Sequence, residues 1–120
     1  MIPPIARRFV AGETAAEALD RARALNDRGV GAILNLLGEH YTEPGPVDED
    51  TEAYLRLLSD LAPAGLDACV SVKPSQVGLS VSEDSFRENL GRVVAHAAAG
   101  NGFVWTDMED HTTVDATLDA

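Results

Sequence analysis

Hydrophobic positions along the chain follow two patterns, helical spacing and short continuous apolar runs, and the two patterns alternate. Helical spacing, bounded by capping residues, prolines or glycines, predicts helices over residues 14–27, 48–61 and 82–99. Apolar runs rich in β-branched residues predict strands over residues 30–37, 68–73 and 103–107. The first run hardly alternates with polar residues, which predicts a strand buried on both faces.

Turn residues complete the prediction. Residues 41–46 contain two prolines and a glycine, which predicts a loop before the second helix. The last ten residues begin a further helix, for which Thr113 is a candidate cap. Cys69 falls inside a predicted strand, where we expect it to pack rather than react.

The order of these elements predicts the fold class. Strands that recur about every 36 residues, with a helix between each pair, indicate parallel strands joined by right-handed crossovers. Three such units cannot close a barrel of eight, which takes about 250 residues. We therefore predict an α/β fold that is the N-terminal part of a (β/α)8 TIM-like barrel. Residues 1–120 would then be a single partial barrel domain holding the first three βα units.

Composition excludes several classes of function. The chain has 20 acidic and 9 basic residues and a net charge of −11, so binding to nucleic acid is not expected. No apolar stretch approaches the roughly 20 residues that span a bilayer, and residues 1–13 lack the apolar run of a secretory signal. With one cysteine there is no internal disulfide. We expect a cytoplasmic protein.

The basic residues are unevenly distributed between types: Lys73 is the single lysine among nine basic residues. An acid excess with so little lysine is typical of halophilic proteins, because concentrated salt screens the self-repulsion of a large net charge. A GC-rich genome that favours Arg and Ala codons gives the same composition. Both explanations stay open at this point.

Polar side chains cluster after each predicted strand. The carboxyl ends of parallel strands meet at one edge of the sheet, where active sites of α/β proteins lie. The single lysine is thus expected to share a rim with several carboxylates, which would orient it and keep it charged. The residues that follow the three strands are Asn35 and Glu39, then Lys73, Ser75 and Gln76, then Asp107, Glu109 and Asp110.

Each of these residues also has a plain structural interpretation. Lys73 could be a solvated charge, and Asp107 could cap a turn. The segment Asp107–His111 holds three carboxylates and a histidine, but without a spacing specific to a metal, and we predict no metal site there. Asp110 and His111 are more typical of a helix start.

At these residues the sequence resembles the proline dehydrogenase family, flavoenzymes with a distorted (β/α)8 barrel. Four motifs in order carry the resemblance, which extends over nearly the whole chain. They are RRFVAGET at residues 7–14, LNLLGE at 34–39, VSVKPSQVGL at 70–79 and DMED at 107–110.

The resemblance implies oxidation of L-proline to 1-pyrroline-5-carboxylate, with a hydride passed to the N5 atom of FAD and electrons then passed to a quinone. It implies that Lys73 and Asp107 are catalytic and border the flavin, with Met108 as a further FAD contact. Lys73 would act as a fixed cation for the substrate carboxylate and for the flavin as it is reduced. Supporting roles are expected for the remaining rim residues, which are Asn35, Glu39, Gln76 and Glu109.

Departures from the family pattern limit what the resemblance implies. The family often has Asp at the position of Asn35, and Leu-Thr where this chain has Pro74 and Ser75. The paired arginines that clamp the proline carboxylate, and most flavin-binding residues, lie on later strands in the family. These 120 residues alone are therefore expected to bind flavin poorly and to catalyse nothing.

Two other functions stay open from the sequence. One is a barrel lyase in which Lys73 forms a Schiff base with its substrate. The other is a non-catalytic barrel fragment that assembles through its sheet edges. Association with the inner face of a membrane is also expected if the electron acceptor is a quinone, without any spanning segment.

Overall fold

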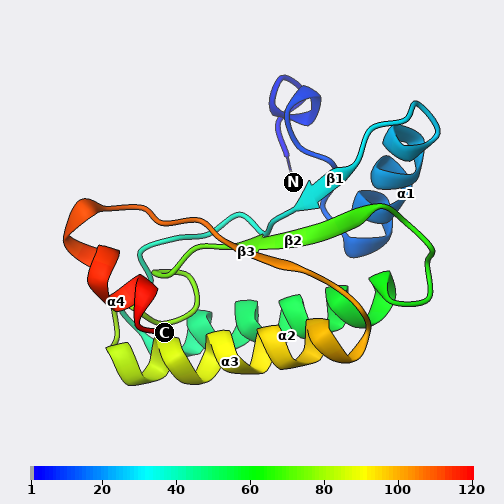
Figure 1. Cartoon of the computed structure of the whole chain (residues 1–120). Helices are drawn as coiled ribbons and strands as arrows, with labels where there is room; N and C mark the ends of the chain where they lie inside the picture. The colour runs from blue at the N-terminus through cyan, green and yellow to red at the C-terminus, as the bar shows by residue number, and fades with distance from the viewer. Residues whose placement is uncertain (1) are drawn as a thin grey trace.

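A computed structural model describes residues 2–120, which form two layers, a parallel sheet and a pair of long helices beneath it (Figure 1). The strands are β1 (Ala32–Leu34), β2 (Ala68–Val72) and β3 (Val104–Thr106). The helices are α1 (Ala15–Asn26), α2 (Pro44–Leu61), α3 (Glu83–Ala99) and α4 (Val114–Leu118). Two short 3-10 turns are η1 (Ala6–Arg8) and η2 (His111–Thr113).

The sheet of residues 2–120 has the strand order β1-β2-β3, and both pairings are parallel. In the register, Leu34 lies beside Val70, and Val70 lies beside Val104. Helix α2 connects β1 to β2, and α3 connects β2 to β3. The predicted fold class, parallel strands that alternate with helices as in a partial barrel, is confirmed.

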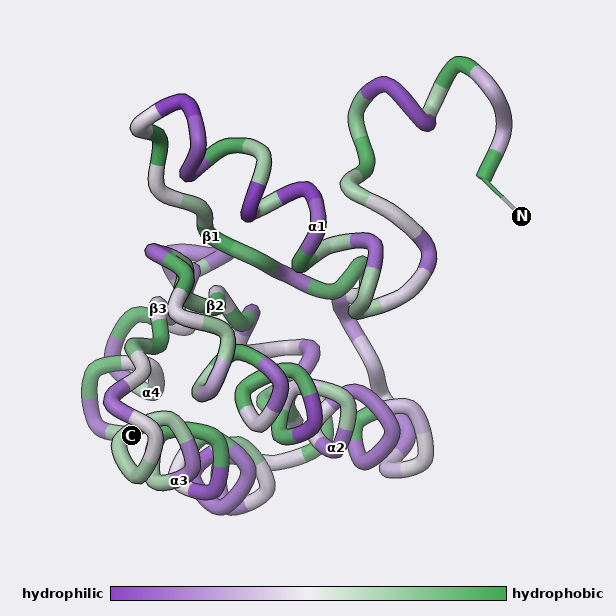
Figure 2. Tube along the Cα trace, turned by 90° about the vertical axis from the view of Figure 1, so that its right-hand side faces the viewer, coloured by the Kyte–Doolittle hydropathy of each residue, from purple (hydrophilic) through white to green (hydrophobic). Residues whose placement is uncertain are grey.

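One face of the sheet forms the core with α2 and α3, which lie side by side beneath the strands (Figure 2). Leu34, Val70 and Val72 project from the strands into this core, and each is at least 92% buried. Tyr54 of α2 and Phe86 of α3 are completely buried against them. Because side chains alternate along a strand, the neighbouring positions must face the other way.

Helix α1 packs at the amino end of β1, with its buried Ala22 in the core. Its predicted N-terminal cap is confirmed, because the Glu17 N–H donates to Thr14 Oγ1 at 3.2 Å. At its C-terminus the Asn26 amide donates to the carbonyl of Asp67 at 3.0 Å and accepts from the Asp67 N–H at 2.8 Å. This amide fixes α1 to the start of β2.

The prediction of a first strand buried on both faces is wrong. Strand β1 has three residues, Ile33 is 57% exposed and Leu37 is 76% exposed. The reason is that α2 and α3 cover only one face of the sheet, so the opposite face of residues 2–120 is open. Cys69 lies on the same face as Ile33 in the register and is only half-buried, so it is not fully packed.

Two smaller predictions also fail. The predicted loop 41–46 ends early because α2 begins at Pro44, and proline at the first helical position costs no hydrogen bond. Thr113 provides no side-chain cap for α4; instead Asp110 accepts from the Thr112 N–H and caps η2. That hydrogen bond lowers the pKa of Asp110. Within residues 2–120, every helix is too short or too polar to cross a lipid bilayer.

Candidate functional site

The carboxyl ends of β2 and β3 bring Lys73 and Asp107 into contact. Lys73 directly follows β2, and Asp107 follows β3, where its N–H extends the strand ladder to the Val72 carbonyl at 2.9 Å. The Lys73 Nζ donates to Asp107 Oδ2 at 3.1 Å. Two residues that are 34 positions apart in sequence thus share the rim that the sequence predicted.

Glu39, in the loop after β1, lies on the same rim with a carboxylate oxygen 3.9 Å from Lys73 Nζ. The Lys73 side chain is 31% exposed, whereas those of Glu39 and Asp107 are more than half exposed. The hydrogen bond that Lys73 donates to Asp107 raises the pKa of Lys73, as do the charges of Asp107, Glu109 and Glu39, while partial burial opposes these effects. Lys73 is therefore a fixed ammonium group at neutral pH.

Behind the rim, a buried polar cluster fixes the ends of β1 and β2. The Tyr54 hydroxyl accepts from the Leu36 N–H at 3.1 Å and lies 2.7 Å from the Ser71 carbonyl oxygen and 3.0 Å from Gln76 Oε1. The Gln76 amide donates to the Leu36 carbonyl at 3.2 Å and to Asp50 Oδ2 at 2.9 Å. Tyr54 and Gln76 are completely buried, so Gln76 supports the rim from behind and does not face solvent.

The other expected site residues lie at the edges of this arrangement. Glu109, in the loop after β3, accepts hydrogen bonds from the N–H and Oγ–H of Ser75 at 3.0 and 2.8 Å. Met108 is 46% exposed beside Asp107. Asn35 lines a separate groove of about 770 Å³ between the N-terminal segment, β1 and α2, rather than the Lys73 cluster.

Three metal-ligating side chains meet at this rim although their sequence spacing did not indicate it. Ligand atoms of Glu39, His40 and Glu109 lie within 4.8 Å of one another, so this group could hold a divalent cation. Both Glu109 oxygens already accept hydrogen bonds from Ser75. The nearby Lys73 ammonium also repels a cation. The other two candidates from the same segment, Asp110 and His111, pair with each other instead.

Sequence reasoning missed the roles of Tyr54 and Ser75. Tyr54 was recognisable as an apolar position of the second helix, and a tyrosine in a core needs a partner for its hydroxyl. Ser75 is 95% buried although it follows a strand at the rim. Nothing in the sequence distinguishes a buried serine from a solvated one, so its position could come only from the structure.

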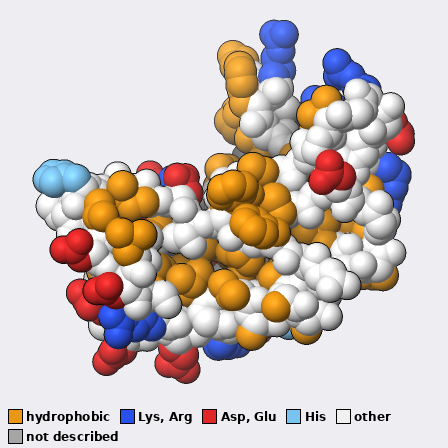
Figure 3. All heavy atoms as spheres, viewed as in Figure 1, with side chains coloured by type: hydrophobic (Ala, Val, Ile, Leu, Met, Phe, Trp, Pro, Cys, Tyr) orange, Lys and Arg blue, Asp and Glu red, His pale blue; other side chains and the backbone are white. Residues whose placement is uncertain are grey.

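The face of the sheet opposite α2 and α3 is apolar and open. Ile33, Phe103 and Trp105 project from it and are each more than half exposed, and the two aromatic rings meet edge to face at 5.1 Å. In Figure 3 hydrophobic side chains gather over the strands in the middle of this view. By alternation along β2 and β3, Lys73 and Asp107 belong to this same open face.

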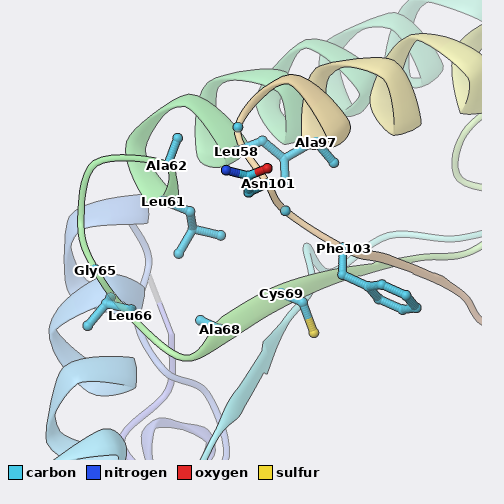
Figure 4. Close-up of a pocket in the computed structure, with 12 residues that line it drawn as sticks. Leu58, Leu61, Ala62, Gly65, Leu66, Ala68, Cys69, Ala97, Asn101 and Phe103 are labelled. Atoms are coloured by element: carbon cyan, nitrogen blue, oxygen red, sulfur yellow. The ribbon is translucent and has the colours of Figure 1, made fainter.

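A small pocket lies at the opposite end of the strands. It has a volume of about 260 Å³ and is enclosed by the ends of α2 and α3 and the starts of β2 and β3 (Figure 4). Cys69 and Phe103 border it, together with leucine and alanine side chains. No carboxylate or lysine lines this pocket, so Lys73 and its neighbouring carboxylates form a separate site.

Burial of Tyr54 leads to a prediction about alkaline pH. Burial, the largest cause, and the nearby charge of Asp50 raise the pKa of Tyr54 to about 12. A raised folded-state pKa contributes stability that is complete below the unfolded value near 10 and is lost as the pH rises toward about 12. In a Tyr41→Phe variant of residues 1–120, in which Tyr54 is the one remaining tyrosine, the absorbance of tyrosinate should appear well above pH 10. A midpoint at the ordinary value would contradict burial of the hydroxyl.

The parallel strands, the alternating helices and the charged rim at the carboxyl end of the sheet are the architecture of part of an α/β barrel. The chain is 38% identical to the proline dehydrogenase of Deinococcus radiodurans over 96% of its own length and 38% of that protein. It is 30% identical to proline dehydrogenase 1 of Bacillus subtilis (strain 168), over 94% of the chain and 37% of that protein. No family-level sequence model matches the chain.

A solved structure has the same fold. Proline utilization A (PutA) from Bdellovibrio bacteriovorus, inactivated by N-propargylglycine, superposes with a TM-score of 0.79 and 21% sequence identity. The superposition covers 96% of this chain and 14% of that one. This superposition shows the fold, and the sequence matches show that the chain is similar to proline dehydrogenases along nearly its whole length. The chain spans 38% of the length of the Deinococcus relative.

Proposed function

We propose that this chain supplies the first three βα units of a barrel that oxidises L-proline to 1-pyrroline-5-carboxylate in proline catabolism. The observation that carries the proposal is the contact between Lys73 Nζ and Asp107 Oδ2 on the open face of the sheet. By the resemblance of the motifs, these two residues would correspond to positions that border the flavin and the substrate. The relatives that match along 94–96% of the chain are named proline dehydrogenases.

The residues present fit FAD as the cofactor. An isoalloxazine ring is flat and largely apolar, with polar atoms at its edge. The open face offers exposed Ile33 and Trp105 as an apolar surface, and the cation of Lys73 at the carboxyl end of the same face. We assign Lys73, Asp107 and Met108 to the part of the cofactor site that this chain contributes. FAD, when bound, supplies the two-electron acceptor for proline oxidation.

The chain's own residues would act by charge and position. Lys73 offers a permanent ammonium group that attracts the proline carboxylate and favours negative charge that develops nearby. Asp107 accepts a hydrogen bond from Lys73 and thereby orients Nζ. Glu39, in the loop after β1, attracts the same ammonium group. Gln76 and Glu109 act from behind the rim on its backbone, and Asn35 is assigned to the periphery of the site.

The proposal also covers the electron acceptor and the location of the protein in the cell. A quinone would receive the electrons, which would bring the protein to the inner face of a membrane as a peripheral enzyme of the cytoplasm. The single cysteine, which makes no internal disulfide, is compatible with a reducing compartment.

The Schiff-base alternative is disfavoured by the charge on Lys73. A lysine that attacks a carbonyl must be neutral, and such residues have lowered pKa values. Here the Asp107 hydrogen bond raises the pKa of Lys73. The other alternative is a non-catalytic fragment, which the following experiment distinguishes from an enzyme.

The complete native protein that contains this sequence should be purified and assayed for bound FAD and for proline-dependent reduction of a dye acceptor. We expect a yellow protein that reduces the dye with L-proline. Borohydride trapping of a carbonyl substrate on Lys73 would support the lyase instead. A colourless protein with neither activity, assembled through its sheet edges, would support the non-catalytic fragment.

Salt should stabilise the protein if its acid excess is a halophilic adaptation. A charge of −11 on 120 residues repels itself, and the Debye length shrinks to about 3 Å in molar salt. The melting temperature is therefore expected to rise between low and molar KCl. A fall over this range would refute the halophilic explanation and leave codon usage as the cause.

A further inference from the structure

Ser75 occupies the centre of the rim although it carries no charge. Its side chain is almost completely buried, whereas those of Glu39 and Asp107 at the same rim are more than half exposed. A buried hydroxyl needs hydrogen-bond partners, because an unpaired one costs about 1–3 kcal/mol. Its partners show what it does.

The Ser75 hydroxyl connects the loops that follow β1 and β3. It accepts a hydrogen bond from the His40 N–H at 2.7 Å and donates one to Glu109 Oε1 at 2.8 Å. The Ser75 backbone repeats both links: its N–H donates to Glu109 Oε2 at 3.0 Å, and its carbonyl accepts from the Tyr41 N–H at 3.2 Å. Four hydrogen bonds at one residue therefore join three loops.

Each residue whose side chain or N–H bonds to the Ser75 hydroxyl is close in sequence to a carboxylate beside Lys73. His40 follows Glu39, and Glu109 lies two residues after Asp107. His40 has a positive φ of 58°, which is costly for a residue with a Cβ, so the hydrogen bond from its N–H must help to hold the loop in place. This fixed loop determines where Glu39 can lie.

Ser75 is also rigidly connected to Lys73 itself. The Lys73 carbonyl accepts from the N–H groups of Gln76 and Val77 at 3.0 and 3.3 Å, which closes a tight turn around Ser75. Pro74 is fully buried within this turn. Movement of Ser75 relative to Lys73 is therefore restricted by the backbone.

Electrostatics explain why the loops need this connection. The carboxylates of Glu39 and Glu109 approach within 4.8 Å, where two like charges repel. Lys73 attracts Glu39 from one side, and the N–H and O–H of Ser75 hold Glu109 on the other. Without the Ser75 hydroxyl, Glu109 would keep only the Ser75 N–H as a donor and the His40 N–H would lose its acceptor, so the link between the two loops would be weaker.

We propose that Ser75 is a positioning residue, which holds the loops after β1 and β3 so that Glu39 and Asp107 flank the ammonium group of Lys73. Glu109 is its partner and acts through Ser75, without contact with substrate. The consequence for proline oxidation rests on the proposed function, but the arrangement around Lys73 does not.

Lys73 is the single lysine of residues 1–120, and its reactivity gives a direct test that does not depend on catalysis. Only the neutral fraction of an amine reacts with an acylating reagent, so the rate at Lys73 reports its surroundings. Ser75→Ala should let the carboxylates move away from Lys73, which lowers the pKa of its ammonium group and increases the neutral fraction. We expect the rate of Lys73 acetylation at mildly alkaline pH to rise by about twofold or more, because a fall of one unit in the pKa gives about tenfold more neutral amine. Ser75→Thr, which keeps a hydroxyl, should react like the wild type. Peptide mapping separates the acetylation of Lys73 from that of every other amine in the protein.

Thr51→Val is the matched control. The Thr51 hydroxyl is buried and donates to the Val47 carbonyl within α2, so its loss removes a buried hydroxyl that makes no contact with Lys73. This variant should leave the acetylation rate unchanged. A rate that rises equally in Thr51→Val would assign the effect to general loosening and would overturn the proposal. A folded Ser75→Ala protein with the wild-type rate would also overturn it.

Ser75→Ala in the complete native protein separates this inference from the proposed function. If Lys73 becomes more reactive and proline oxidation falls, while Ser75→Thr retains both properties, both proposals are supported. If Lys73 becomes more reactive in a protein that never oxidises proline, Ser75 still positions the rim and only the proposed function fails.

Discussion

Replacing Lys73 with methionine is expected to lower proline-dependent dye reduction by the complete native protein by about 100-fold or more, the usual loss when one preorganised electrostatic group is removed. Methionine has similar length but no charge, so the open face keeps its shape. The Lys73–Asp107 pair is partly exposed, and such pairs contribute little to stability. The variant should therefore fold normally, with its melting temperature close to that of the wild type.

Matched variants separate charge from packing in this experiment. Lys73→Arg keeps a cation near Asp107 and should retain part of the activity, with a larger change in KM than in kcat. Arg92→Met removes a different half-exposed cation, one that pairs with Glu52 across α2 and α3, and should leave activity unchanged. Wild-type turnover in Lys73→Met, or equal losses in Lys73→Met and Arg92→Met, would remove Lys73 from the proposed site.

The contact of Lys73 with Asp107 could be foreseen because it depends on topology more than on side-chain detail. Parallel strands joined by helices place their carboxyl ends together, and a lysine and an aspartate one position beyond adjacent strands must then meet. The short apolar runs over residues 68–73 and 103–107 were sufficient to locate both strands. The resulting distance of 3.1 Å follows from the register, in which Val72 lies beside Thr106.

The exposure of the first strand could not be foreseen from its apolar run. Ile33 and Leu34 are equally apolar, yet one is exposed and the other buried, because α2 and α3 cover a single face. An apolar run indicates that both faces of a strand become buried in the complete fold, not which elements bury them. In the proposed barrel, this open face would be the interior.

Buried polar contacts were the least predictable part of the site. Tyr54 and Ser71 are 17 residues apart, and Ser75 and Glu109 are 34 apart. Hydrogen bonds at such separations depend on how the helices pack against the sheet. A tyrosine at an apolar helix position signals only that its hydroxyl needs some partner.

Replacing Tyr54 with phenylalanine is expected to lower the free energy of unfolding by about 1–3 kcal/mol, the cost of leaving buried partners unpaired. The ring would still fill the core, but the Leu36 N–H and the Ser71 carbonyl would lose a partner. Urea denaturation of wild type and variant measures the difference. The loss should be greater than in Tyr41→Phe, because the Tyr41 hydroxyl bonds Asp50 in a partly exposed position where water can replace it.

Gln76→Leu should cost a similar amount, since it removes the partner of both Tyr54 and Asp50. The two losses should not add in the double variant, because groups that share one hydrogen-bond network interact by about 0.5–3 kcal/mol. Each single variant leaves one polar group of the Tyr54–Gln76 contact buried without its partner. The double variant removes both polar groups, so that cost disappears. Strict additivity in the double-mutant cycle would mean that Tyr54 and Gln76 hold the ends of β1 and β2 independently, and the cluster behind Lys73 would then not act as one unit.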